Sequence, residues 1–135
     1  MFILDSCICI ELMRGKLPRT FEFMRGLPAS AFKIPYIVEA ELLTGAEKSG
    51  NPVSMRMKTL QFLAPFERLA LDDESAQAYA ETRALLEKKG CKIGPNDLII
   101  ASIALAHGAT IVTRNVREFS RVPHLKVEDW EEIEL

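Results

Sequence analysis

The chain has 135 residues, of which 48% are hydrophobic and 27% are charged, and its formal net charge is −2. This length and hydrophobic content predict one domain over residues 1–135, built around a single packed core. The slightly acidic balance excludes a protein that binds nucleic acid through overall basicity, because affinity for phosphate comes largely from clustered Lys and Arg side chains.

The first third of the chain alternates short apolar runs with helical patterns. Residues 2–4 form an apolar run that predicts a buried strand, and Asp5 follows as the N-cap of a helix reaching about Arg14. The pattern then predicts a short helix over 19–25, a brief strand over 33–35 and a helix over 36–48. Strands and helices therefore alternate from the start.

The remainder of the chain continues this alternation. It predicts helices over 53–64, 73–89 and 98–106, strands over 66–71, 109–113 and 125–127, and a helical turn around residue 119. The helix over 73–89 is amphipathic, with Ala76, Tyr79, Ala80 and Leu86 expected on its apolar face. Near the end, Trp130 lies among acids and is expected to anchor the tail to the core.

Short strands alternating with helices predict an α/β fold in which a mainly parallel sheet lies between two helical layers. A right-handed crossover needs a helix between parallel neighbours, so helices cover both faces. In such sheets, ligands bind at the carboxyl ends of the strands. Asp5 and the pair Arg114-Asn115 both follow predicted strands at that edge, so we expect the functional site there.

The cysteines indicate a reducing compartment. Cys7, Cys9 and Cys91 are odd in number and form no C-x-x-C pair or zinc-type cluster with His. No apolar stretch reaches membrane-spanning length, and no basic segment precedes the first apolar run. These features predict a soluble cytoplasmic protein.

Three acidic residues stand where apolar segments meet a turn or a helix. Asp5 follows the first strand, Glu41 lies in the helix over 36–48, and Asp97 opens the apolar helix over 98–106. Taken singly, each has an ordinary explanation as a helix cap, a first-turn acid that suits the helix dipole, or an exposed side chain. As a set they are harder to explain in this way, because acids that border buried faces usually have a partner.

Carboxylates gathered at one sheet edge repel one another unless a positive charge lies between them. A divalent cation meets that need, and oxygen ligands without His or Cys favour Mg²⁺ or Mn²⁺. Such an ion lowers the pKa of a bound water, orients it for attack on phosphorus and neutralises charge on the leaving oxygen. The three acids therefore predict a metal site suited to cutting nucleic acid.

Three segments of the chain resemble the successive motifs of PIN-domain ribonucleases, specifically the VapC toxins of bacterial toxin–antitoxin pairs. They are FILDSCICIELMRGK, VEAELLTGAEKSG and IGPNDLIIASIALAHGATIVTRNVREFSRVPHLKVEDW. The resemblance implies a three-layer α/β/α PIN-like domain that acts as a Mg²⁺- or Mn²⁺-dependent endoribonuclease on RNA. It further implies a VapB-type antitoxin that holds the toxin inactive, and a homodimer.

Carried over by position, the resemblance implies that Asp5, Glu41 and Asp97 hold the metal and serve the hydrolysis. Glu118 or Asn115 completes the acidic pocket. We rank Glu118 first as the fourth catalytic acid, because the amide of Asn115 adds no charge and supports the pocket only by holding a water or weakly binding the metal.

The chain departs from the family pattern directly after the first strand. The family usually reads Asp-Thr-Asn at this point, whereas here Ser6 and Cys7 follow the aspartate. Ser6 keeps the hydroxyl, but Cys7 loses an amide that supports the pocket. The departure puts the fine positioning of the aspartate in question, and with it the level of activity.

Three further residues are candidates for supporting roles. Thr113, at the end of the strand over 109–113, can bond an acid or a phosphate, although capping the next turn explains it equally well. Arg114 and Arg117 flank the proposed pocket, where guanidinium groups bind phosphates bidentately. Ordinary exposure on a solvated surface explains the two arginines equally well.

Two other functions remain open. A receiver-like signalling domain is also doubly wound and holds Mg²⁺ while an aspartate accepts phosphate, but it needs adjacent acids after the first strand, where Ser6 follows Asp5. The second alternative is a PIN-like binding module that has lost catalysis, because Cys7 and Asn115 depart from the family pattern.

Overall fold

Five parallel strands form the central sheet of the computed structural model, which describes residues 1–135. Their order is β3-β2-β1-β4-β5. The strands are β1 (Phe2–Leu4), β2 (Phe32–Pro35), β3 (Glu67–Leu69), β4 (Thr110–Val112) and β5 (Lys126–Glu128). The α-helices are α1 (Ser6–Met13), α2 (Pro18–Arg25), α3 (Tyr36–Glu47), α4 (Pro52–Leu63), α5 (Asp73–Lys88), α6 (Pro95–His107) and α7 (Val116–Phe119). Two 3₁₀ segments, η1 (Ala29–Ala31) and η2 (Trp130–Glu134), complete the elements.

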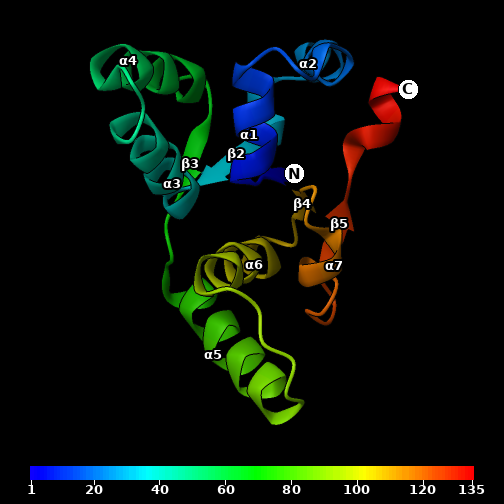
Figure 1. Cartoon of the computed structure of the whole chain (residues 1–135). Helices are drawn as coiled ribbons and strands as arrows, with labels where there is room; N and C mark the ends of the chain where they lie inside the picture. The colour runs from blue at the N-terminus through cyan, green and yellow to red at the C-terminus, as the bar shows by residue number, and fades with distance from the viewer.

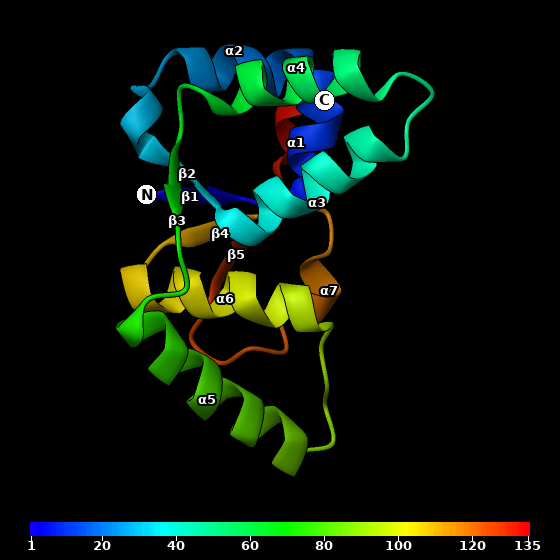
Figure 2. The ribbon, with the colours of Figure 1, turned by 90° about the vertical axis from the view of Figure 1, so that its left-hand side faces the viewer.

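Helices α1 to α4 cover one face of the sheet and α5 to α7 the other (Figures 1 and 2). This division follows from right-handed crossovers. The chain moves outward from β1 through β2 to β3, then returns across the sheet to β4 and continues to β5. The strand order therefore reverses between β1 and β4, and a crevice is expected at their carboxyl ends. The predicted three-layer α/β/α architecture is confirmed.

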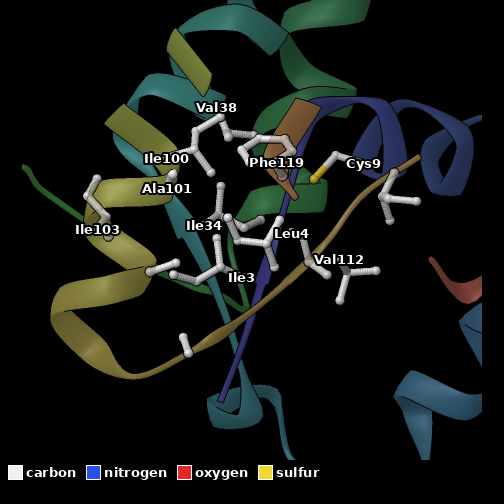
Figure 3. Packing of buried hydrophobic residues seen from close by; sticks show 14 of the residues in the cluster. Ile3, Leu4, Cys9, Ile34, Val38, Ile100, Ala101, Ile103, Val112 and Phe119 are labelled. Atoms are coloured by element: carbon white, nitrogen blue, oxygen red, sulfur yellow. The ribbon is translucent and has the colours of Figure 1, made fainter. Parts of the chain in front are cut away.

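The core is continuous across the sheet because parallel strands are buried on both faces. Figure 3 shows Ile3, Leu4 and Ile34 of β1 and β2 within one cluster that also contains Ile100 of α6. Five of the 13 residues of α6 are buried in this cluster. The N-terminal turn of α6, which carries Asp97, is therefore fixed by the packing of the rest of the helix.

The apolar face predicted for α5 is partly wrong. Ser75, Thr82 and Leu86 are the buried residues of the helix, whereas Ala76 and Ala80 are exposed. Positions 75, 82 and 86 lie on one side of a helix at spacings of seven and four, and this side faces α6. Small hydroxyl side chains are accepted here because their polar atoms have partners, as when the Ser75 hydroxyl donates to Asp72.

Strand ends also differ slightly from the sequence prediction. β3 covers 67–69 instead of 66–71, and β5 covers 126–128 instead of 125–127. Gly90 and Gly108 adopt φ values of +67° and +60° after α5 and α6, as expected of residues that end helices. None of the helices is both long enough and apolar enough to cross a bilayer.

Trp130 anchors the C-terminal segment, as predicted. Its ring is buried and meets Phe2, Phe23 and Phe32 edge-on, with centroid separations of 5.1, 5.3 and 6.2 Å. Further along, the Glu134 carboxylate accepts hydrogen bonds from two backbone N–H groups at the start of α2. No side chain caps α2 from its own N-cap position, so the acidic tail satisfies donors that are otherwise open.

We predict that Trp130→Ala lowers the free energy of unfolding by about 3–5 kcal/mol, because it removes a large aromatic side chain from the core. Urea unfolding followed by circular dichroism measures the change. Trp130→Phe, which keeps an aromatic ring at this position, is expected to lose less. An alanine variant within about 1 kcal/mol of the parent would show that the tail is not held by this ring.

Candidate active site

Asp5 lies where β1 ends and α1 begins, beside the end of β4. Its side chain is only 5% exposed. Oδ1 accepts from the backbone N–H of Ser6 at 2.7 Å, and Oδ2 accepts from the Thr113 hydroxyl at 2.7 Å. The backbone N–H of Asp5 donates to Val112 of β4. Asp5 thus caps α1, as predicted, and is fixed against both neighbouring segments.

Thr113 makes a stronger contribution than the sequence indicated. Its hydroxyl is fully buried and accepts from the backbone N–H of Asn115 at 2.9 Å, so its own hydrogen is free to point toward Asp5. The Cys7 sulfur lies 3.5 Å from Asp5 Oδ2 and 3.7 Å from Thr113 Oγ1. Burial raises the pKa of the Cys7 thiol, so it remains a neutral, weak donor to the aspartate.

Asp97 lies in the first turn of α6, next to the other acids. Burial raises the pKa of its carboxyl to about 7. The charges of Asp5, Glu118 and Glu41 act in the same direction, in that order. Carboxyl groups from β1, α3, α6 and α7 are therefore close enough to oppose one another's ionisation.

Glu41 contributes a buried carboxylate oxygen that has no hydrogen-bond partner. This atom is Oε1, and the residue lies in the second turn of α3. Burial raises the pKa of the Glu41 carboxyl; the side chain of Asn96 partly offsets this, and the charge of Asp5 adds to it. An unpaired buried carboxylate is costly, so this oxygen is suited to a cation or a bound water.

Glu118 and Asn115 connect α7 to the start of α6. Glu118 Oε1 accepts from the backbone N–H of Gly94, and Oε2 accepts from Asn115 Nδ2 at 2.8 Å. The same Nδ2 lies 3.3 Å from Asp97 Oδ2, to which it donates. The hydrogen bond from the Gly94 N–H lowers the pKa of Glu118 most, and the bond from Asn115 lowers it further. The Glu118 carboxylate therefore stays charged beside Asp97.

The two predicted phosphate-binding arginines differ in their surroundings. Arg114 forms ion pairs with Glu11 of α1 at 3.0 Å and Asp129 of the C-terminal segment at 3.8 Å. Arg117 is exposed and pairs with no acid. Arg114 therefore joins two parts of the chain, and Arg117 is the guanidinium that is free to meet a phosphate.

The donor set fits a hard divalent cation that keeps much of its water. No three His, Cys, Asp or Glu side chains stand close enough to hold an ion between them directly. Mg²⁺ does not require such a cage, because it binds proteins through one or two carboxylates and several waters. Asp5, Glu41 and Asp97 offer carboxylate oxygens, one of them unpartnered, and none of the three forms an ion pair with Lys or Arg. The residues present therefore suit the ion that the sequence predicts.

Comparison with known proteins finds matches over nearly the whole chain. The family model described as "PIN domain" matches residues 2–125. The chain is 38% identical to "Ribonuclease VapC2" of Rickettsia felis, over 97% of this chain and 98% of that protein. It is 36% identical to "tRNA(fMet)-specific endonuclease VapC" of Salmonella typhimurium, over 96% of this chain and 97% of that protein.

Solved structures also contain chains that are similar in fold and in sequence. VapBC2 from Rickettsia felis, bound to a DNA fragment from the promoter, matches with a TM-score of 0.87 and 37% identity, covering 96% of this chain and 98% of the other. DNA-bound VapBC from Salmonella typhimurium matches with a TM-score of 0.90 and 35% identity, covering 96% and 97%. The similarity thus extends over nearly the whole of each chain.

The raised pKa of Asp97 predicts how the metal-free protein responds to pH. Its pKa is about 7 in the folded chain and 3.8 as an isolated group. The folded state therefore binds this proton more tightly. The stabilising contribution is complete below about pH 4 and is lost as the pH rises to about 7.

Asp97→Asn is therefore expected to be more stable than the parent at pH 8 in EDTA, by on the order of 1 kcal/mol after allowing for solvent screening of a partly exposed carboxyl. At pH 4 the two proteins should be nearly equal. Urea unfolding at both pH values measures the difference, with the exposed Asp73→Asn as control. Equal stability of Asp97→Asn and the parent at pH 8 would contradict the crowding of charge described above.

Proposed function

This chain belongs to the PIN-domain family, among the VapC ribonucleases, and on that basis we propose that it is an endoribonuclease toxin that hydrolyses RNA phosphodiester bonds with a bound Mg²⁺ or Mn²⁺ ion. The proposed metal ion is supported by the absence of a positively charged partner for the acidic residues of the site. The charges of Asp5 and Glu41 act on Asp97, yet no Lys or Arg pairs with these acids and Glu41 Oε1 has no partner. RNA as the substrate class is supported by the ribonuclease names of the relatives.

In this proposal, Asp5 and Asp97 are the principal ligands. A bound divalent ion supplies acidity to a coordinated water and neutralises charge on the phosphate. Asp5 is held for this role by the Ser6 N–H and the Thr113 hydroxyl, and so presents a fixed carboxylate. Glu41 uses its unpartnered oxygen to orient the attacking water or to accept its proton.

Phosphate positioning falls to the residues around the pocket. Arg117 is exposed and unpaired, so its guanidinium can meet a phosphate of the RNA. Arg114 would have to leave its partners Glu11 and Asp129 to do the same. We therefore assign the main phosphate contact to Arg117.

A VapB-type antitoxin is the proposed protein partner, since similar structures are VapBC complexes. An apolar groove of about 580 Å³ between α1, α2 and α4 suits such a partner. Phe21, Phe62 and Phe66 line it, and its only charged lining residues are the basic Arg25 and Lys58. This chemistry favours an amphipathic helix of the antitoxin with acidic residues beside its apolar face. A homodimer is also part of the proposal, and light scattering of the purified chain measures it.

Substitution of the ligands tests the nuclease proposal. Asp5→Asn and Asp97→Asn are each expected to reduce metal-dependent RNA cleavage by more than about 100-fold, because supporting residues around metals alone contribute roughly 10–100-fold. Cleavage of a labelled RNA with Mg²⁺, Mn²⁺ or EDTA measures this, with Asp73→Asn as the matched control.

Assays of RNA cleavage and RNA binding test the assigned site and the alternative of a binding module. Retained cleavage in either ligand variant would refute the assigned site. A parent protein that binds RNA without cutting it would indicate a binding module that has lost catalysis. The receiver-like alternative is wrong, because the PIN-domain family model matches residues 2–125.

The groove assignment has its own test. Phe21→Glu places a negative charge in the groove at a residue that is 50% exposed, so the fold should tolerate it. The variant is expected to bind the cognate antitoxin at least 30-fold more weakly, as for loss of an aromatic hot spot. Calorimetry measures the affinity, with Leu71→Glu, exposed outside the groove, as control. Equal weakening in both variants would show that the groove is not the docking site.

A further inference from the structure

Asn115 lies at the point where β4 turns into α7 and has bonds toward both principal ligands. Its backbone N–H donates to Thr113 Oγ1 at 2.9 Å, and that hydroxyl donates to Asp5 Oδ2 at 2.7 Å. The first link therefore runs from the Asn115 backbone through one buried hydroxyl to Asp5.

The Asn115 side chain makes the second link. Its Nδ2 donates to Glu118 Oε2 at 2.8 Å and to Asp97 Oδ2 at 3.3 Å. An amide nitrogen has two hydrogens, so both carboxylates are served by one group without adding charge. The carbonyl oxygen, which is the atom of an amide that binds metals, is not the atom facing these acids.

Glu118 fixes this amide from the other side. While one of its oxygens accepts from Asn115, the other accepts from the backbone N–H of Gly94, directly before α6. Asp97 lies in the first turn of that helix. Glu118 therefore ties α7 to the segment that carries Asp97, and each of its oxygens already has a donor.

We propose that Asn115 is a positioning residue that sets the separation of Asp5 and Asp97, and that Glu118 is the anchor of Asn115 instead of a fourth metal ligand. This inference rests on the proposed metal site. It reverses the order expected from the sequence, in which Glu118 ranks as an acid of the pocket and Asn115 as its weaker substitute. An amide suits position 115 because its two N–H hydrogens donate to both carboxylates.

Mn²⁺ affinity, measured by calorimetry or electron paramagnetic resonance without RNA, tests the proposal. Asn115→Ala and Glu118→Ala are each expected to weaken Mn²⁺ binding by about 10–100-fold, the range for residues that orient metal ligands. Because Asn115 and Glu118 act through the same hydrogen-bond network, the Mn²⁺ affinity of the double variant should be within about threefold of that of the weaker-binding single variant. Multiplying effects in the double variant, or unchanged affinity in Asn115→Ala, would overturn the proposal.

Glu118→Gln in the Asn115→Ala background separates an anchor from a ligand. The single oxygen of glutamine can still accept from the Gly94 N–H, and no Asn115 side chain remains to be held, so an anchor predicts Mn²⁺ affinity within about threefold of Asn115→Ala. A further fall of more than about tenfold would make Glu118 a ligand and overturn the proposal. Ser120→Ala, at the exposed end of α7, controls for general loosening of this helix, and melting temperatures confirm that the variants fold.

Mn²⁺ binding by Asp97→Asn distinguishes failure of the proposed metal site from failure of the positioning role of Asn115. If this variant binds Mn²⁺ as tightly as the parent, the proposed metal site itself is wrong. If it loses binding while Asn115→Ala does not, the metal site stands and the positioning role fails.

Discussion

Repulsion between carboxyl groups at the carboxyl ends of β1 and β4 is the constraint that the surrounding structure serves. The pKa of Asp97 rises to about 7 because burial and the nearby acids disfavour its charged form. A cluster of this kind is unfavourable in the isolated chain, and a divalent cation reverses the sign of the effect. The stability lost as the pH rises from about 4 to about 7 thus comes from the same feature that suits the pocket to binding an ion.

The scaffold holds this charge in place by distributing donors around it. Asp5 has a helix N-terminus and a buried hydroxyl, Glu118 has the Gly94 N–H, and the amide of Asn115 lies between two acids. All of these donors are neutral. They orient the carboxylates without neutralising them, so the pocket remains negative. Glu41 Oε1 is buried and has no donor, which is consistent with an oxygen left for a ligand.

The sequence was sufficient to predict the sheet, its helical layers and the convergence of acids, because these depend on apolar periodicity and on the position of strand ends. Asp5 and Asp97 were expected at this edge in this way, and their role as metal ligands stays a prediction. The bond from Thr113 to an acid was expected only as one of two explanations, and the Arg114 ion pairs were not expected, since both depend on how the turn after β4 and the C-terminal segment approach α1. The buried face of α5 was also missed in part, because the size and satisfied hydroxyl of Ser75 matter more there than hydrophobicity.

Helix α1 connects the two functional regions proposed for this chain. Asp5 caps its first turn, and Leu12 and Met13 from its last turn line the apolar groove. At eight residues α1 is about 12 Å long, so the groove and the acidic pocket lie about that far apart along the helix. An antitoxin would need roughly four further extended residues to reach from one to the other. In this proposal, inhibition by blocking the pocket would depend on such an extension and affinity on the groove, and substitutions at opposite ends of α1 would separate the two.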